Sequence, residues 1–437
     1  MKRRSSFAFG FLALIGLGAV LLSAPFARAA GTWGDFSNAL FTACSAVCVT
    51  GLTVVEVATE YTPAGLAILV TLVEIGGVGL MTLGTFLLVA IGRRLSLSSE
   101  FSLMNAYGAP AVKGLKGLIF WVVGSMAAFQ FLGAAALYWR LGDVKMSLFY
   151  SAMNFCNAGF SLHPGSLAHF AGDPWALGVM TFLTVAGGIG FLVIYNLCTY
   201  RFLRRGSGVR GRLTLHSVTV LRFSAYLVLV MLAAFLLIEW NAGLRDFSPV
   251  QKLSVGLYQS VTPRTCGFCI VPTESLHPLT RLIYEVMMFI GGGPGSVSGG
   301  IKVTTFAVLV YTLTAMCRGE TETVIARRTV PMEIVRESIV ILVALLAFVA
   351  LVTGALFVTE ERSGIPLDAL FFEAVSAVTT TGLSMGDTTV SLSRGGRVVI
   401  MLAMFIGRLG ALTVVMMIGD RESTRRIRYP NEELVVG

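Results

Sequence analysis

Long apolar runs, separated by short polar segments, recur along the whole chain. Each of the eight longest contains close to the roughly 20 residues that a helix needs to cross the hydrocarbon layer of a bilayer. They cover Phe7–Leu22, Leu66–Ile91, Leu118–Trp139, Trp175–Leu197, Val218–Ile238, Leu282–Ala315, Ile339–Val358 and Val398–Ile418. The pattern predicts an all-α, multi-pass membrane protein with eight transmembrane helices and both termini on one side of the membrane.

Four further apolar segments are too short to cross, and they share one pattern. In each, about ten mostly small or apolar residues lead to a glycine that is followed by Leu or Phe. The glycines are Gly51, Gly159, Gly267 and Gly382, which stand 108, 108 and 115 residues apart. This recurrence indicates four internal repeats, each a span, a re-entrant half-helix, a glycine turn and a second span. We expect the repeats to surround a pseudo-four-fold ion pore.

The repeat period also predicts where the units of the 437-residue chain begin and end. We expect repeat 1 over residues 1–92, repeat 2 over 93–200, repeat 3 over 201–317, repeat 4 over 318–420, and a cytoplasmic tail over 421–437.

Composition narrows the class of protein further. Only 13% of the residues are charged, against roughly 25% in soluble proteins, which argues against a soluble enzyme and a disordered chain. The net charge of +9 would suit a nucleic-acid partner or the basic cytoplasmic face of a membrane protein. Nearly two thirds of the 33 Lys and Arg residues fall in the segments that a cytoplasmic N-terminus places inside. We therefore expect cytoplasmic termini and no nucleic-acid partner.

The first apolar run has two interpretations. Basic residues, an apolar stretch and the sequence Ala27-Arg28-Ala29 match a secretory signal peptide. However, the apolar stretch is long for a signal peptide, and the repeat pattern needs this helix as its first span.

The glycine turns suggest a cation site. The C-terminal end of a half-helix carries roughly half a negative charge, and glycine permits the positive φ that a sharp turn requires. Four such turns would form a ring of backbone carbonyls that replaces the hydration shell of a cation, acting as a selectivity filter. The expected filter residues are Val49, Thr50, Gly51, Asn157, Ala158, Gly159, Thr265, Cys266, Gly267, Thr380, Thr381 and Gly382.

A glycine-rich segment interrupts the second span of repeat 3. Six of its ten residues are Gly and one is Pro, so a continuous helix is not expected. A phosphate-binding loop would need Lys directly after its last Gly and a preceding strand, and neither is present. We interpret the segment as an intramembrane gate below the filter. Its residues are Gly291, Gly292, Gly293, Pro294, Gly295, Ser296, Val297, Ser298, Gly299 and Gly300, with Lys302 following.

Arg408 lies inside the last apolar run, where a charge is costly. Two roles remain open, which can coexist: it faces the pore near the gate, or it pairs with a carboxylate or with carbonyls for packing. The apolar runs contain no pattern of nucleophile and base or of metal ligands, so we expect no enzymatic activity, no catalytic residues and no metal other than potassium at the filter.

Together these features resemble the superfamily of Trk, Ktr and HKT potassium transporters, and most of all its Ktr-type membrane subunit. The resemblance covers essentially the whole chain. It rests on the four glycine turns, the repeats, the loop Gly291–Gly300 and the sequence Phe405-Ile-Gly-Arg408. Pro294 and Ala411 depart from the family pattern, in the gate loop and directly after Gly410.

The resemblance implies a function and a set of partners. The chain would take up K⁺ across a bacterial inner membrane, with Na⁺ as a candidate coupling or activating ion, and would retain its first helix. It would form a homodimer, contact membrane lipid, and be regulated by a cytosolic RCK-type ring that carries the nucleotide; no cofactor is expected in this chain. The alternative is an alternating-access transporter for another small cation or solute, although such proteins use inverted repeats and these repeats are parallel.

Overall fold

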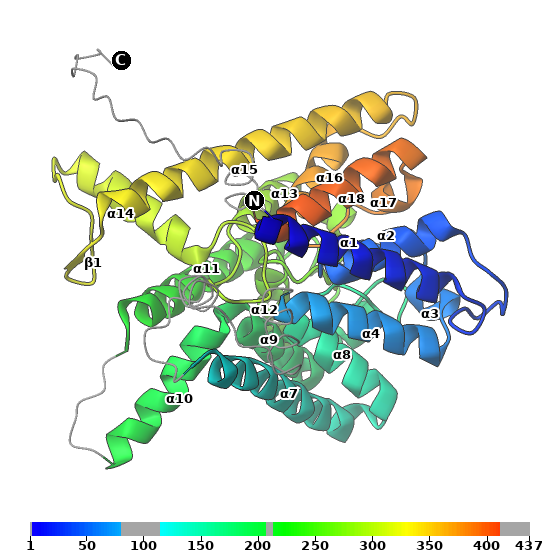
Figure 1. Ribbon diagram of the computed structural model, residues 1–437, viewed down its shortest axis with the longest axis horizontal. Coiled ribbons are helices and arrows are strands. Elements are labelled where there is room, and N and C mark those ends of the chain that lie inside the picture. Colours follow the sequence, from blue (N-terminus) through cyan, green and yellow to red (C-terminus); the bar gives the residue numbers. More distant parts are fainter. Residues whose placement is uncertain (1, 80–113, 207–212, 411–437) are drawn as a thin grey trace.

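The computed structural model describes residues 2–79, 114–206 and 213–410. Most of them are helical, and the helices surround a group of loops at the centre of Figure 1. The short helices α2, α8 and α16 lie toward the right of that view, whereas the β1–β2 hairpin and the end of α10 lie at the left.

One order of elements occurs four times along the described chain: a first helix, a short helix and a second helix. Unit 1 contains α1 (Lys2–Ser23), α2 (Phe36–Val47) and α4 (Pro63–Val78); unit 2 contains α7 (Gly114–Leu141), α8 (Val144–Cys156) and α9 (Pro174–Ile189); unit 3 contains α11 (Leu215–Glu239), α12 (Pro249–Val261) and α13 (Pro278–Phe289); unit 4 contains α15 (Met332–Thr359), α16 (Leu367–Val378) and α18 (Arg394–Leu409).

The remaining elements connect these helices. They are α3 (Val57–Glu60), η1 (Ala168–Phe170), α10 (Phe191–Gly206), η2 (Thr273–Ser275), α14 (Val303–Cys317), β1 (Val324–Ile325), β2 (Arg328–Thr329) and α17 (Thr388–Ser391). The two strands pair antiparallel, with Val324 opposite Thr329 and Ile325 opposite Arg328.

Side-chain caps set the start of three of the short helices. Asp35 accepts a hydrogen bond from an amide in the first turn of α2, and Asp143 does the same for α8. Ser248 and Gln251 form a capping box at the start of α12. Such caps satisfy amides that the first turn of a helix leaves without a partner.

The four units close into a ring in chain order. Each short helix packs against the first helix of its own unit and against the second helix of the unit before it. The contacts between units are α4 with α8, α9 with α12, α13 with α16, and α18 with α2. The last of these joins unit 4 to unit 1, so the four units form a closed ring.

The prediction of eight spans needs correction at the second helices of units 1, 2 and 4, which end at glycines. The predicted span Trp175–Leu197 is two helices, α9 and α10, bent by 98°. Gly190 at the bend has φ +99°, and Gly79 and Gly410 end α4 and α18 with φ +80° and +84°. Only glycine adopts this conformation readily. Within the described residues, α7, α11 and α15 are long and apolar enough to cross a bilayer, and the bent pair would make a fourth span.

Parts of two other predicted spans, 80–91 and 411–418, lie outside the described residues, as do Ala411 and the predicted tail over 421–437.

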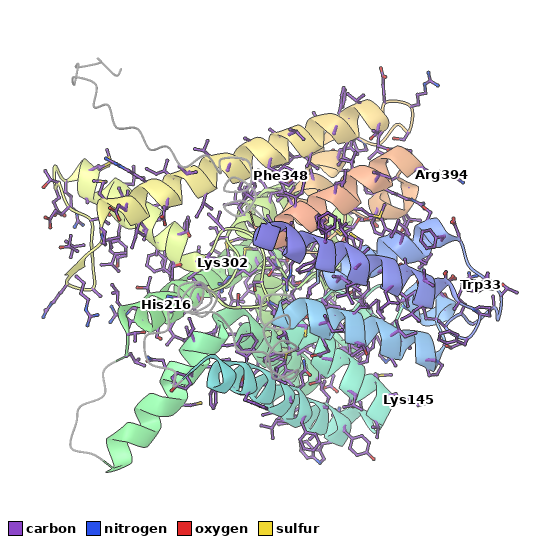
Figure 2. The ribbon with its side chains drawn as sticks, in the orientation of Figure 1. Trp33, Lys145, His216, Lys302, Phe348 and Arg394 are labelled. Carbon is purple, nitrogen blue, oxygen red and sulfur yellow. The ribbon has the colours of Figure 1, made fainter. Side chains whose placement is uncertain are left out.

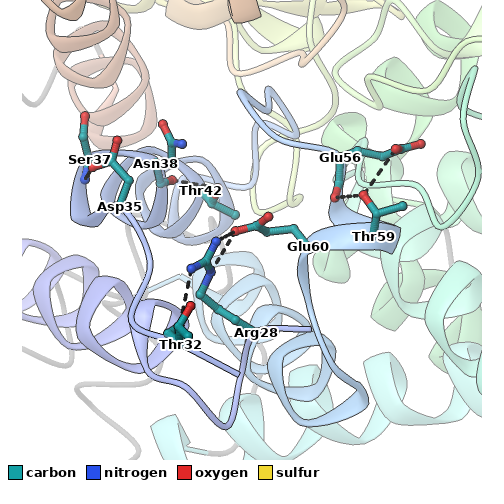
Figure 3. Close-up of polar contacts among 9 residues, drawn as sticks. All are labelled: Arg28, Thr32, Asp35, Ser37, Asn38, Thr42, Glu56, Thr59 and Glu60. Atoms are coloured by element: carbon teal, nitrogen blue, oxygen red, sulfur yellow. Dashed lines mark hydrogen bonds and ion pairs between the residues drawn. The ribbon is translucent and has the colours of Figure 1, made fainter. Parts of the chain in front are cut away.

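The segment that matches a signal-peptide cleavage site is paired with the chain before α4. Arg28 donates a hydrogen bond from Nε to Glu60 at 2.8 Å and forms an ion pair with it (Figure 3). The Thr62 amide donates to the Ala27 carbonyl at 2.9 Å. In addition, α1 packs against both α2 and α4. These contacts favour the interpretation of α1 as a structural helix over that of a signal peptide.

Candidate functional site

The four predicted filter segments follow the C-terminal ends of the short helices, and each contains the same unusual turn. The residue two positions before the glycine has a left-handed backbone: Val49 (φ +55°), Asn157 (+55°), Thr265 (+72°) and Thr380 (+51°). For a β-branched residue such as Val or Thr this conformation is an outlier. It costs on the order of 1–3 kcal/mol and persists only where the surroundings impose it. The fold therefore imposes the same turn at four equivalent places, with strain at Val49, Thr265 and Thr380.

Backbone hydrogen bonds stabilise these turns. In three of them, the amide just before the glycine donates to the carbonyl five residues earlier, which is the long bond of a Schellman cap. These bonds are Thr50 to Ser45 (2.8 Å), Ala158 to Met153 (2.9 Å) and Thr381 to Ser376 (2.8 Å). In the third segment, Cys266 instead donates to Thr262 at 3.0 Å.

The four glycines face one another in chain order. A Cβ added to Gly51 would collide with the Gly159 amide nitrogen, and one added to Gly159 would lie 2.8 Å from the Gly267 carbonyl oxygen. A Cβ on Gly267 would lie 2.5 Å from the carbonyl oxygen just before Gly382. One on Gly382 would collide with the carbonyl just before Gly51. The predicted filter segments are thus brought together into a closed ring too tight for any side chain.

Backbone conformation gives a second reason for three of these glycines. Gly51, Gly267 and Gly382 have φ +95°, +81° and +90°, which side-chain-bearing residues rarely adopt. Gly159 has no positive φ, so at this position space alone excludes a side chain.

Oxygen atoms without donors line the same region. The predicted filter residues are buried, apart from the half-buried Gly159. The hydroxyl oxygens of Thr50, Thr265 and Thr380 are buried and have no hydrogen-bond partner within the described residues. A buried polar atom without a partner is unfavourable in an otherwise dry interior. Such oxygens suit a cation that has lost its water.

The glycine-rich loop between α13 and α14 lies directly against this ring. Its two ends are tied by hydrogen bonds from Gly291 to Ile301 (2.9 Å) and from Ile301 to Phe289 (3.0 Å). The Ser298 hydroxyl lies 3.1 Å from the side-chain amide of Asn157 in the second filter segment. A Cβ on Gly299 would collide with the hydroxyl of Thr380 in the fourth. The predicted gate residues therefore contact the predicted filter.

Other loop residues contact the bend between α9 and α10. The Gly293 amide donates to the Gly188 carbonyl at 2.8 Å, and Phe191 donates to the Gly295 carbonyl at 3.1 Å. A Cβ on Gly190 would lie 2.6 Å from the Pro294 carbonyl oxygen. The bend at Gly190 thus makes room for the loop.

Basic side chains hold the carbonyls of this loop. Lys302, near the centre of Figure 2, donates to the Ser298 carbonyl at 2.5 Å. Arg408 donates to the Val297 carbonyl and to the Gly76 carbonyl of α4, each at 2.5 Å. Of the two roles open for Arg408, pairing with carbonyls is the one observed, and one of these carbonyls belongs to the predicted gate.

A third basic residue was missed by the sequence prediction. Arg264 is buried, and one of its terminal nitrogens donates to the Gly291 carbonyl (3.1 Å) and to the Ser224 hydroxyl (3.2 Å). The sequence feature that could have identified Arg264 is its position three residues before the filter glycine, where the other three segments carry only small, uncharged residues.

A set of glycines in the second helices was also missed. A Cβ at any of them would collide with the carbonyl of the residue four positions before the filter glycine of its own unit. The pairs are Gly76 with Val47, Gly187 with Phe155, and Gly407 with Val378. The sequence feature that could have identified these glycines is the spacing Gly-x-x-Gly, which recurs at 76–79, 187–190 and 407–410. These glycines let the second helices of units 1, 2 and 4 touch the ends of their short helices.

Comparison with known proteins agrees with this arrangement. Residues 23–424 match the family model described as "TrkH: Cation transport protein". The chain is 36% identical to the Ktr system potassium uptake protein B of Bacillus subtilis, over 98% of this chain and 96% of that protein. It is 32% identical to the potassium/sodium uptake protein NtpJ of Enterococcus hirae, over 98% and 96% of the two chains.

A solved structure has the same fold. The potassium transporter TrkH from Vibrio parahaemolyticus superposes with a TM-score of 0.74, covering 96% of this chain and 85% of that one, at 17% sequence identity. With the family model spanning most of the chain and full-length relatives above 30% identity, the chain belongs to the TrkH family of cation transport proteins.

Proposed function

We propose that this protein takes up potassium through a pore lined by the four filter segments. The observation that carries the proposal is the closed ring of Gly51, Gly159, Gly267 and Gly382, in which each glycine meets the next segment. Relatives of nearly full length are named as potassium uptake proteins, which supports K⁺ as the ion.

The chemistry of the ring suits a dehydrated cation. Four helix C-termini, each with roughly half a negative charge, end at the ring. Backbone carbonyls of the filter segments would replace the water of the ion, and the buried hydroxyls of Thr50, Thr265 and Thr380 add oxygens without donors. The strained turns hold these oxygens in place, so that they do not collapse around a smaller ion.

The described conformation corresponds to a closed gate in this proposal. The loop from Gly291 to Gly300 lies against filter segments 2 and 4, and Lys302, Arg408 and Arg264 hold three of its carbonyls. Positive charge beneath the filter also opposes the passage of a cation. Uptake requires the loop to move and these hydrogen bonds to break.

The topology belongs to the same proposal. Residues 1–92, 93–200, 201–317 and 318–420 form the four repeats, the short helices enter from the outer side, and both termini lie in the cytoplasm of a bacterium. The β1–β2 hairpin, with Arg327 and Arg328, lies at the end of the molecule opposite the short helices in Figure 1, as the excess of inner positive charge predicts.

We also propose a homodimer with a cytosolic nucleotide-binding ring of RCK type as its regulatory partner. The support for a partner is the similarity to proteins named as components of a Ktr system, one of them protein B and another protein D of Bacillus subtilis. The ring would contact the basic inner loops. Sodium is a candidate coupling ion, because one relative is named for potassium and sodium uptake.

Ion flux into proteoliposomes tests the proposal. The purified protein is reconstituted, and K⁺ and Na⁺ uptake are measured with and without a co-purified cytosolic subunit. We expect K⁺ uptake to exceed Na⁺ uptake and the subunit to change the rate. Equal uptake of both ions, or transport of another solute in place of K⁺, would overturn the proposal in favour of a different transporter.

A further inference from the structure

The filter segments are held in place in two different ways. In units 1 and 4, a serine six residues before the glycine accepts a hydrogen bond from the glycine amide: Ser45 from Gly51 and Ser376 from Gly382, each at 3.0 Å. Units 2 and 3 carry Met153 and Val261 at this position, and neither side chain can accept that bond strongly. The filter segments of units 2 and 3 therefore need another support.

A buried polar cluster occupies the space behind these two segments. Its centre is Tyr258 on α12, which is 1% exposed and whose hydroxyl donates to Asn154 Oδ1 on α8 at 2.7 Å. Asn154 is oriented by its own Nδ2, which donates to the Tyr150 carbonyl at 2.8 Å. Thr184 on α9 also lies 3.3 Å from Asn154 Oδ1. Three helices from two units thus meet at one amide.

The cluster contacts the filter at Cys266, the residue directly before Gly267. Its Sγ lies 3.6 Å from the Tyr258 hydroxyl and 3.5 Å from Thr184 Oγ1, and the side chain is fully buried. Because the Tyr258 proton is directed to Asn154, the thiol is the donor in the contact between Cys266 and Tyr258. A displacement of Tyr258 would therefore move the backbone of Cys266.

The same cluster touches the second filter segment. In the amide orientation that satisfies all its neighbours, Asn157 donates to the carbonyls of Asn154 (2.9 Å) and Thr184 (3.2 Å). Its oxygen then accepts from the Ser298 hydroxyl of the loop at 3.1 Å. Both filter segments without a serine are thus connected to the group centred on Tyr258.

We propose that Tyr258 is a positioning residue for ion selectivity. Together with Asn154 and Thr184 it fixes the filter carbonyls of units 2 and 3, as Ser45 and Ser376 do in units 1 and 4. This inference rests on the proposed potassium pore. Selectivity by a carbonyl ring depends on oxygens that keep their spacing when a smaller ion enters. Loosening this half of the ring admits sodium more readily and leaves potassium transport in place.

Tyr258→Phe tests this inference, because it removes only the hydroxyl. The measured quantity is the ratio of K⁺ to Na⁺ uptake in proteoliposomes. We expect the ratio to fall about fivefold, the effect of about one buried hydrogen bond, with the K⁺ rate changed less than the ratio.

Tyr284→Phe is the matched control. Tyr284 is as buried as Tyr258, and its hydroxyl also donates one hydrogen bond, to the Gln259 carbonyl at 2.9 Å. Among the described residues it forms no hydrogen bond with a filter residue, so the ion ratio of this variant should match that of the wild type. An equal fall in both variants would mean that any lost hydrogen bond near α12 loosens the filter, which would overturn the specific role of Tyr258.

Asn154→Leu and the double variant with Tyr258→Phe complete the design. Because both residues act through one contact, their effects on the ion ratio should be less than additive. Additive effects, or an unchanged ratio in Tyr258→Phe, would overturn the inference. The wild-type measurement distinguishes a failure of this inference from a failure of the proposed function, because a wild type without K⁺ preference contradicts the proposed function itself.

Discussion

Replacing Arg408 by Gln should open the gate. Within the described part of the chain, the wild-type guanidinium donates charged hydrogen bonds to the Val297 carbonyl of the loop and to the Gly76 carbonyl of α4. Each bond of this kind contributes about 1.5–3 kcal/mol. If the variant loses only one of them in the closed state, the open fraction rises about tenfold or more, because about 1.4 kcal/mol corresponds to a factor of ten.

Initial K⁺ flux per reconstituted protein is the assay. Arg397→Gln serves as the control, since Arg397 lies on the same helix and donates to the carbonyls of Leu392 and Val390 and to Asn38. None of these partners belongs to the glycine-rich loop, so this variant should keep the wild-type flux. A flux in Arg408→Gln equal to or below that of the wild type, at equal incorporation and thermal stability, would refute the reasoning.

Three further variants test separate parts of the account. Gly159→Asp should abolish K⁺ uptake without loss of membrane insertion, because its Cβ would lie 2.8 Å from the Gly267 carbonyl; growth of a potassium-uptake-deficient strain on low K⁺ with this variant would contradict it. Deletion of Ser296–Gly299 should raise K⁺ flux, and adding Arg408→Gln should then raise it no further; an unchanged or lower flux would count against the gate. His163 lies in the loop between α8 and α9, where burial and then the charge of the neighbouring His169 lower its pKa from 6.5. Folding therefore favours the neutral form of the imidazole. The stability that this contributes is present above about pH 6.5, the pKa of the unfolded chain, and is lost as the pH falls from there through the lower pKa of the folded protein. The thermal midpoint should fall between pH 7.5 and pH 5.5, and it should fall less in His163→Gln; the same fall in both would exclude this group.

Much of the fold follows from local pattern. The short helices, their glycine turns and the glycine-rich loop are each encoded by a continuous stretch of residues, so periodicity and turn chemistry predict them. The bend at Gly190 was not predicted, because its cause is the loop carbonyl of Pro294, which lies about a hundred residues away in the sequence and packs against it.

The candidate site divides in the same way. The filter glycines could be proposed from their spacing, but their order around the ring depends on contacts between units, such as α18 with α2. Arg264 looks like an isolated charge in the sequence, and its partner Gly291 appears only when α12 and α13 are packed. Tyr258 could not be distinguished from any other aromatic core residue, because its role depends on Asn154 in another unit.

The central claim is that the cation passes through the ring of filter segments. Thallium, which replaces K⁺ and scatters anomalously, can be located in crystals of the protein. The account predicts an anomalous peak inside the ring, next to the hydroxyl oxygens of Thr50, Thr265 and Thr380. Thallium bound elsewhere in the membrane region, with no peak at the ring under conditions that support transport, would contradict it.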